Sequence, residues 1–566
     1  MKKIVLWIVA ALLVVGASIA ALMLRPKEGD VEVLFPIEDP LFVYVNLEQL
    51  AAKGAFDSYI TPENRSFIAS VLSSQLEDIE KSEHLRNIVS NIDVLGLDIH
   101  KHIYGYLNNS LTEFAIVVDI LDVAQVDCSV ALLSYFHEQN GEDAIEVIKE
   151  DDIRLFEYNG VAVAYNNRTF AVAFGADNAN LAVAKEALAR PKFDMSIFGV
   201  SDLAVLINTG KCAELANAKI EEATLALEME YNNGDIDTEE YHIENRAIIA
   251  NSELVSRYAS YFESDSNILL STTFDLGRMT LAYSSHGINF GEYAAMCKPT
   301  GTTHLGNLSV DTYAVMSAGV DGELLSKFVR SLLSGDMLRS VGITPTNEVN
   351  MFVSIACDAL STIDGDVTLA LEDIDGEIKS RYNYYWDEYY IEPSIKSVKA
   401  MLMADVTDTY IISNIAQFAG GFLRKVDATH YTLRLMNYNF SMGQDENLFH
   451  LGVNMSPERQ TLSALDSAWA KDVEGAMAYA VVNIDALMAS KFMKSTNKYV
   501  ATQLLEEYRE LYGRATEMVS YAYVAVDALD AAEVVVVFDD QSLNALEQIN
   551  ALILPTLVQT SVKSLF

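Results

Sequence analysis

Hydrophobic and polar residues alternate in short blocks along the chain after residue 30, and longer stretches with a helical spacing of apolar residues separate these blocks. Alternation with a period of two predicts half-buried strands, whereas apolar residues spaced three and four apart predict amphipathic helices. Several strand pairs are joined by connections too short for a parallel crossover. The pattern therefore favours an α+β fold with largely antiparallel sheets covered by helices on one face over a doubly wound parallel sheet.

One signature recurs four times: a short apolar strand closes on Asn or Asp and runs directly into a helix. The side-chain oxygen of such a residue accepts a hydrogen bond from a free backbone N–H in the first turn of the helix. We therefore expect all four closing residues to be helix caps. They are Asn46, Asn208, Asp321 and Asn483.

The spacing of the four copies indicates a duplication, because 272 residues separate Asp39 from Asp311 and 275 separate Asn208 from Asn483. Other segments keep the same order in both parts of the chain. We match 114–122 with 367–375, 168–175 with 447–454, and the strand pair 268–283 with 521–538.

This order predicts two tandem duplicated halves after an N-terminal segment 1–30, each made of two α/β subunits. The expected first half is 31–300, with subunits 31–195 and 196–300, and the second is 301–566, with subunits 301–465 and 466–566. Long helices are expected at 211–231, 246–262 and 495–513, the last beginning at Ser495 and ending on Gly513.

The N-terminus predicts a membrane helix. Lys2 and Lys3 precede an uncharged run of 21 residues from Ile4 to Leu24, which is long enough to cross a bilayer. The two lysines are expected to stay inside, so the rest of the chain lies outside the cytoplasm, in the periplasm or at the cell surface. The alternative is a secretory signal cut after Ala20, which releases the protein. A lipid-modified N-terminal cysteine is excluded, because the first cysteine is Cys128.

The strand-to-Asn-to-Leu signature, its repetition and the export segment together resemble a family of secreted bacterial proteins known only as a domain of unknown function. The resemblance covers nearly all of residues 39–566 through a short, apolar motif. It implies a duplicated α+β architecture and no activity. Members of such families often carry a lipid-anchoring cysteine near the N-terminus. This chain differs from them, because its first cysteine is Cys128.

The charge balance excludes one class of partner. The chain has 80 acidic and 39 basic residues, a formal net charge of −41, so nucleic acid would be repelled. The four cysteines form no CxxC pair and lie far from any histidine at ligand spacing, which predicts buried thiols rather than disulfides or a zinc site.

Recognisable catalytic or cofactor motifs do not occur. Neither GxxxxGK[ST] nor GxGxxG is present, and Lys211 lacks the upstream glycine of a phosphate loop. Ser317 lacks the preceding glycine of a nucleophile elbow. His100 and His102 have no visible third ligand. We therefore expect no cofactor and no metal site.

Acidic residues are clustered between Asp364 and Glu377, with Asp366, Asp373 and Asp375 between them. Their alternation resembles a calcium loop, but the order of ligands in an EF-hand is not met. In so acidic a chain, a solvated turn is the simpler interpretation. Whether two carboxylates approach each other at the separation that glycoside hydrolysis requires is a three-dimensional question.

The most unusual segment is 381–393, in which five tyrosines and a tryptophan lie within nine residues. We interpret its first half as an insertion, and surface aromatic residues with polar tips are typical of contacts with partners or sugars. The alternative is a hairpin folded back over its own half. The candidate binding residues are Tyr384, Tyr385, Trp386, Tyr389 and Tyr390.

The sequence thus predicts an exported, membrane-anchored protein of the cell envelope that acts as a non-enzymatic binding or scaffolding module. Its expected partners are the membrane, through the N-terminal helix, and a protein or a glycan. The alternative function is a carboxylate-dependent hydrolase of glycans or peptides that uses Asp387 and Glu388 or the cluster from Asp364 to Glu377.

Overall fold

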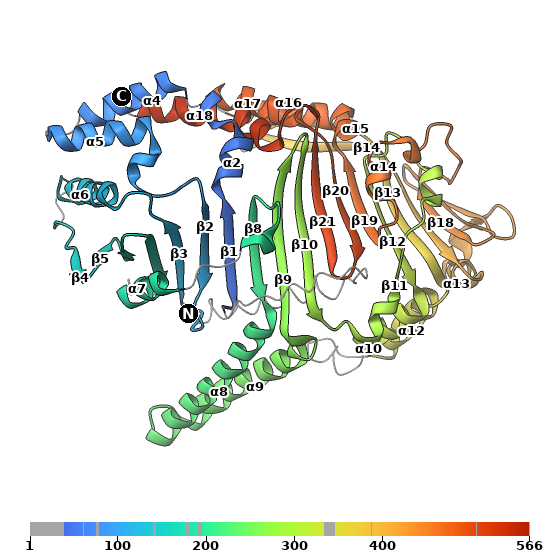
Figure 1. The fold of residues 1–566 in the computed structure, drawn as a ribbon. Coiled ribbons are helices and arrows are strands. Elements are labelled where there is room, and N and C mark those ends of the chain that lie inside the picture. Colours follow the sequence, from blue (N-terminus) through green and yellow to red (C-terminus); the bar gives the residue numbers. More distant parts are fainter. Residues whose placement is uncertain are drawn as a thin grey trace. The chain divides into compact units, whose positions relative to one another are not determined.

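The computed structural model describes residues 39–564, apart from positions 60, 75–77, 140–142, 176–179, 191–194, 333–345, 386–387 and 505. The fold is α+β and its strands pair antiparallel (Figure 1). The expected N-terminal helix, 4–24, lies outside the described residues. Within the described part of the chain, no helix is both long enough and apolar enough to span a bilayer.

The described residues form two compact units. The first unit contains residues 39–289 and 541–564, and the second contains residues 290–540. The C-terminal segment thus belongs with the first unit, whereas the sequence predicts a second half of 301–566. Contacts within the first unit explain this difference, because the Asn550 side chain donates a hydrogen bond to the carbonyl of Gly54 at 2.8 Å.

Ten antiparallel strands build the sheet of the first unit, in the order β4-β5-β6-β7-β3-β2-β1-β8-β9-β10. The central strand β1 lies between β2 and β8 (Figure 1). The strands are β1 (Leu41–Asn46), β2 (His102–Leu107), β3 (Glu113–Asp119), β4 (Ile148–Glu150), β5 (Ile153–Tyr158), β6 (Val161–Tyr165), β7 (Thr169–Gly175), β8 (Leu203–Asn208), β9 (Phe262–Asp275) and β10 (Arg278–Ile288).

Helices cover both faces of this sheet, not one face as the sequence predicts. On one face, α7 approaches closely because its buried Ala184 and Ala187 meet alanines of β3, β6 and β7. On the other face, Val126 and Val130 of α6 pack on Phe156. The helices are α2 (Leu47–Gly54), α3 (Phe56–Tyr59), α4 (Pro62–Ser74), α5 (Ile79–Ser90), η1 (Ile92–Leu95), α6 (Val123–Gln139), α7 (Leu181–Ala189), η2 (Met195–Phe198), α8 (Thr209–Asn233), α9 (Thr238–Ala259) and α18 (Ala545–Ser564).

The sheet of the second unit has the order β15-β16-β17-β18-β14-β13-β12-β19-β20-β21, with β11 beside the end of β12. Its central strand β12 lies between β13 and β19. The strands are β11 (Cys297–Lys298), β12 (Ala314–Asp321), β13 (Ile363–Asn383), β14 (Glu388–Val406), β15 (Arg424–Lys425), β16 (Tyr431–Leu435), β17 (Tyr438–Asp445), β18 (Leu448–Val453), β19 (Ala478–Asn483), β20 (Val519–Ala528) and β21 (Ala531–Phe538).

Of the segment pairs matched from the sequence, one occupies the same position in the strand orders of the two sheets and another does not. Segments 168–175 and 447–454 supply β7 and β18, which stand at the same place in their sheets. The match of 114–122 with 367–375 is wrong, because the first supplies β3 while the second lies in β13, the neighbour of the central strand. Apolar alternation marks a strand but does not specify its neighbours.

Helices also lie on both faces of the second sheet, with α13 against one face and α14 against the other. The helix predicted at 495–513 is two helices. Ser490 rather than Ser495 caps the first, and Gly513 lies inside the second. The elements are η3 (Gly291–Met296), η4 (Thr303–Asn307), α10 (Gly322–Leu332), α12 (Asn347–Leu360), α13 (Tyr410–Ala419), η5 (Gly420–Phe422), η6 (Ala464–Asp466), α14 (Trp469–Asp472), α15 (Ile484–Ala489), α16 (Lys491–Gln503) and α17 (Glu506–Thr516).

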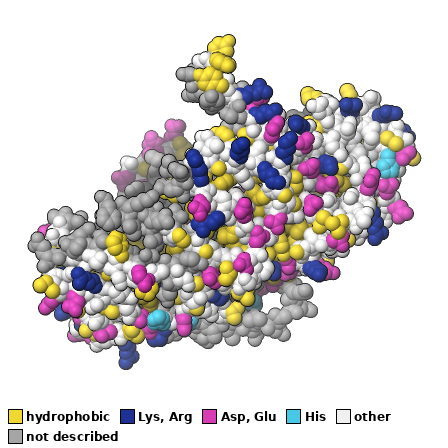
Figure 2. All heavy atoms as spheres, turned by 90° about the horizontal axis from the view of Figure 1, so that it is seen from above, with side chains coloured by type: hydrophobic (Ala, Val, Ile, Leu, Met, Phe, Trp, Pro, Cys, Tyr) yellow, Lys and Arg dark blue, Asp and Glu magenta, His cyan; other side chains and the backbone are white. Residues whose placement is uncertain are grey.

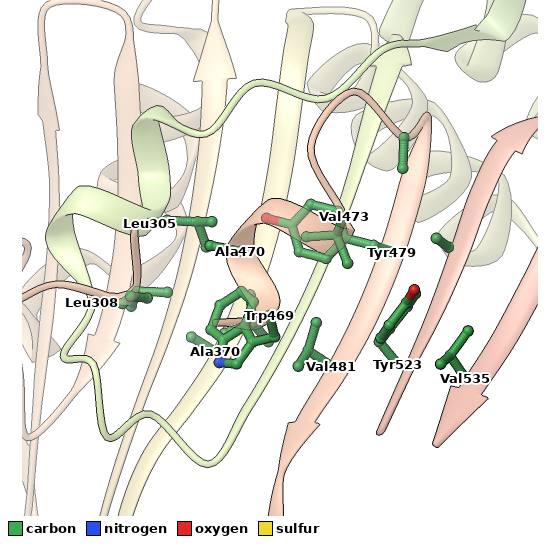
Figure 3. Packing of buried hydrophobic residues seen from close by; sticks show 14 of the residues in the cluster. Leu305, Leu308, Ala370, Trp469, Ala470, Val473, Tyr479, Val481, Tyr523 and Val535 are labelled. Carbon is green, nitrogen blue, oxygen red and sulfur yellow. The ribbon is translucent and has the colours of Figure 1, made fainter. Parts of the chain in front are cut away.

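The core of the second unit forms where η4, η6 and α14 lie on the sheet. Trp469 of α14 is 2% exposed and lies over the sheet beside Ala370 and Val481 (Figure 3). The small side chain of Ala370 leaves room for the indole, and complete burial of so large a ring contributes strongly to stability. Tyr479 and Tyr523 extend this core across the neighbouring strands.

The four predicted helix caps are confirmed. The side-chain oxygens of Asn46, Asn208, Asp321 and Asn483 accept the backbone N–H three residues later, at 3.1, 2.8, 3.1 and 3.1 Å. Each cap satisfies a donor that has no partner within its own helix. The same local device thus turns four strands into helices.

Candidate functional site

The aromatic segment lies at the end of a long two-stranded ribbon. The pairing of β13 with β12 ends at Leu371, and the pairing of β14 with β18 starts at Ala400. Between these points the two strands pair only with each other, among the ladders described. Register shifts on either side of Asp373 mark where the ribbon leaves the sheet. We call residues 373–399 the ribbon.

The base of the ribbon is held by α16. The backbone N–H of Ile378 donates to the Ser495 hydroxyl at 2.9 Å. Gly376 lies against Phe492, whose ring would be 3.3 Å from a Cβ at that glycine. The ion pair between Lys379 and Glu377 at 3.2 Å adds to the polar surface of the ribbon. The ribbon is therefore fixed on its own unit, because β13 packs against α16.

The tip of the ribbon is exposed where the structure describes it. Tyr384 is 88% exposed and Tyr385 is 97% exposed. The rings of Tyr382 and Tyr384 meet edge to face with centroids 5.0 Å apart. The backbones of Tyr389 and Tyr390 belong to β14, and their side chains, like Trp386, lie outside the description. The rings of Tyr384 and Tyr385 thus face water.

The carboxylates of the predicted acidic cluster have separate partners. Asp364 pairs with Lys298, and Asp366 accepts the N–H of Gly301 at 2.8 Å. The hydroxyl of Tyr313 donates to Asp373 at 2.9 Å. The described members of the cluster are therefore distributed along one strand. Of the other predicted pair, Asp387 and the side chain of Glu388 lie outside the described residues.

His100 and His102 also have separate partners. Nε2 of His100 lies 2.9 Å from Asp93 on the surface, while Nδ1 of His102 lies 3.0 Å from the hydroxyl of Tyr44. The structure does not bring them together as ligands. The four cysteines are free thiols, but the prediction that they are buried holds only in part, because Cys357 is buried whereas Cys128 is exposed. Burial raises the pKa of Cys212 to about 11.

A buried chain of polar side chains, which the sequence did not reveal, crosses the second sheet. Ser317 Oγ lies 2.9 Å from Thr368 Oγ1, and Nδ1 of His304 lies 2.8 Å from the same hydroxyl. Nε2 of His304 lies 3.1 Å from Asp405. An ionised carboxylate only accepts, so Nε2–H donates to Asp405. In the neutral imidazole, the Thr368 hydroxyl then donates to Nδ1 and the Ser317 hydroxyl donates to Thr368.

This order of hydroxyl, imidazole and carboxylate resembles a catalytic triad, but both hydroxyls are only 1% exposed. Burial raises the pKa of Asp366. Burial also raises the pKa of Asp405, yet the hydrogen bonds from His304 and from the N–H of Asp366 outweigh it, so the net shift is downward. A substrate does not reach the hydroxyls in this arrangement. The role of these hydrogen bonds is structural, because they hold η4, which carries His304, on the sheet.

A second cluster lies on the same sheet, where three strands bring two histidines together. His450 of β18 pairs with Gly443 of β17, and the register of β16 places His430 beside Gly443 on the other side. A Cβ at Gly443 would lie 2.2 Å from the His430 ring and 2.6 Å from the His450 ring. Glycine thus lets the two imidazoles converge, with centroids 5.7 Å apart.

Asp445 completes this cluster. It lies two residues beyond Gly443, on the same face of β17, and its carboxylate is 3.3 Å from Nε2 of His430. Nδ1 of His430 lies 2.9 Å from Asp427. Burial lowers the pKa of His430, but Asp427 and Asp445 outweigh it and the net shift is upward. Burial lowers the pKa of His450.

The face that Figure 2 shows carries side chains of both charges. On the face that Figure 2 shows, acidic, basic and hydrophobic side chains of the described residues are interspersed.

Comparisons with known proteins identify no function. No protein-family model and no curated protein matches the chain. Two solved structures of the protein TP0453, its crystal forms III and IV, are similar to parts of it at 12% identity. They cover 48% and 44% of this chain and 80% and 76% of their own chains, with TM-scores of 0.21 and 0.20.

Proposed function

We propose that the chain is an exported, non-enzymatic binding or scaffolding module of the cell envelope, and that the ribbon tip is its contact surface. One observation supports this proposal above the others: Tyr384 and Tyr385 are almost fully exposed on a ribbon whose base is fixed by α16. Because its base is fixed, the ribbon has less conformational entropy to lose when it binds, which favours binding. Burial of the rings by a partner would gain about 25 cal/mol per Å² of apolar area.

The partner that this tip suits is a polypeptide or a glycan. Tyrosine offers both an apolar ring and a hydroxyl, and polar Asn383, Glu388 and Arg381 flank the rings in sequence. Arg381 is paired with Glu392 on the ribbon. A contact surface of this kind binds by stacking and hydrogen bonding rather than by net charge.

We also propose that the two units are tandem copies of one ancestral unit. The identical order of neighbours around β1 and β12 and the four equivalent caps support this proposal. The ribbon would then be an extension of the β13–β14 hairpin, because the hairpin at the same place in the first unit, β2–β3, spans only His102–Asp119.

The cellular location rests on the N-terminal run Ile4–Leu24, which we propose anchors the protein with residues beyond Lys27 outside the cytoplasm. Protease treatment of intact cells and of spheroplasts tests this. We expect residues 39–566 to be degraded only from the outer side and the intact protein to sediment with membranes. Full protection in spheroplasts would contradict the proposed orientation, and a soluble mature form lacking residues 1–20 would favour signal cleavage.

The tip is tested with the double variant Tyr384→Ala and Tyr385→Ala. Because both rings are exposed, we expect the thermal midpoint to change by less than about 1 °C while binding on a glycan array and crosslinking to envelope proteins are lost. Phe422→Ala is the matched control, since Phe422 is 83% exposed and lies outside the ribbon. Binding that survives the double variant, or is lost equally in the control, would exclude the tip as the contact.

A further inference from the structure

The structure points to a divalent transition-metal site in the second unit: we propose that His430, Asp445 and His450 bind Zn²⁺. One nitrogen of each imidazole and one carboxylate oxygen of Asp445 lie within 4.8 Å of one another. The three residues come from three adjacent strands or their ends, so the sheet register fixes their separation. This site is independent of the ribbon and of the function proposed for it.

A second observation supports a ligand here. His450 is 3% exposed, and its Nδ1 is buried with no hydrogen-bond partner among the described residues. A buried polar atom without a partner destabilises a fold unless something satisfies it. An ion bound through Nδ1 would satisfy this atom without requiring a proton.

Asp427 orients His430 in the way that histidine ligands of metals are usually oriented. Its carboxylate accepts from Nδ1–H of His430, at 2.9 Å, so Nε2 is the nitrogen that faces Asp445 and would bind the ion. Nε2 of His430 and Oδ1 of Asp445 are 3.3 Å apart. In a tetrahedral zinc site with bonds of about 2.0–2.1 Å, neighbouring ligand atoms are about 3.3 Å apart.

The chemistry of the ligands selects the ion. Two imidazoles and one carboxylate suit Zn²⁺ and related transition ions, whereas Mg²⁺ and Ca²⁺ prefer oxygen ligands. His430 is 27% and Asp445 64% exposed in the side chain, so the ion has a path from solvent. Three protein ligands leave a fourth position open to water.

The test is calorimetric titration of the full-length protein, purified in detergent and stripped with a chelator, with ZnCl₂ and separately with MgCl₂. We expect one Zn²⁺ per chain to bind tightly and Mg²⁺ not to compete. His430→Gln and Asp445→Asn change partly exposed residues and should fold normally, and each should weaken Zn²⁺ binding by more than about tenfold. Asp427→Asn should weaken it by about tenfold, since Asp427 only orients His430.

His100→Gln is the matched control, because His100 and Asp93 form a surface pair at 2.9 Å that has no third ligand among the described residues. This variant should bind Zn²⁺ like the wild type. Co²⁺ should give a visible absorption spectrum that is lost in His430→Gln and kept in His100→Gln. Absence of tight Zn²⁺ binding by the wild type, or unchanged binding by His430→Gln, would overturn the site.

Discussion

Asn208 and Asn483 are bound in the same way in two different units. Each residue ends a strand and caps the following helix with its side chain. Each also donates its backbone N–H to the carbonyl of the residue that precedes the neighbouring strand, β1 or β12. The partners are the carbonyl of Pro40, at 3.0 Å, and that of Tyr313, at 2.9 Å. Two hydrogen bonds at each asparagine thus fix the point where a strand becomes a helix.

Loss of either cap should destabilise its own unit. Asn208→Ala and Asn483→Ala each remove the acceptor for a helical N–H, so we expect each to lower the free energy of unfolding by about 1 kcal/mol. Chemical denaturation followed by circular dichroism measures this. Asn208→Ser and Asn483→Ser keep an acceptor and should restore most of the loss. An alanine variant as stable as the wild type would show that the cap contributes nothing.

The ion pair between Lys53 and Asp202 should contribute more than a surface pair. Asp202 is fully buried and accepts from Lys53 at 2.7 Å and from the N–H of Phe274 at 2.7 Å. Lys53→Met leaves a buried carboxylate without its cation, and we expect a loss of about 3 kcal/mol. Adding Asp202→Asn removes that charge and should recover part of the loss in the same denaturation assay.

The control for this pair is Lys327→Met. Lys327 and Glu323 are 2.9 Å apart, but both side chains are more than half exposed. Such a pair contributes less than about 0.5 kcal/mol because water screens it. Equal losses in Lys53→Met and Lys327→Met would contradict the assigned role of burial.

Thr368 is the centre of the buried polar chain, because its hydroxyl contacts both Ser317 and His304. Thr368→Val keeps the shape but leaves both neighbours without this partner, so we expect a loss of about 1–3 kcal/mol. Thr502→Val, at an exposed helix position, should change stability by less than about 0.5 kcal/mol. Thermal and chemical unfolding of the two variants compare them directly, and equal effects would refute a buried network.

Asp366 should give the protein a specific pH dependence. Burial raises its pKa in the folded state above the unfolded value of about 3.9, so folding favours its protonated form. Its contribution to stability is therefore greatest at low pH and is lost as the pH rises through the folded pKa. The free energy of unfolding of Asp366→Asn minus that of the wild type should therefore increase as the pH rises from 3.5 to 6.5. Denaturation at both pH values measures this difference. A constant difference would show that the pKa is not raised.

Local features could be predicted from the sequence. The four caps and most strands were found because a cap joins residues three apart and a strand repeats every two residues. The polar, aromatic run between two strands left an exposed tip and a folded-back hairpin open, and the structure shows Tyr384 and Tyr385 exposed. The limits of α16 and α17 were missed because Ser490 and Ser495 are equally good caps locally.

The tertiary structure alone decided which strands are neighbours. The match of 114–122 with 367–375 failed because alternation is the same in any strand of a half-buried sheet. No short-range sequence pattern shows that His430, Asp445 and His450 meet across neighbouring strands. The same holds for Ser317, Thr368 and His304. The sequence by itself determined the elements and their caps, whose physics is short-range. Sheet register, set by the packing of the whole core, determined which polar side chains meet.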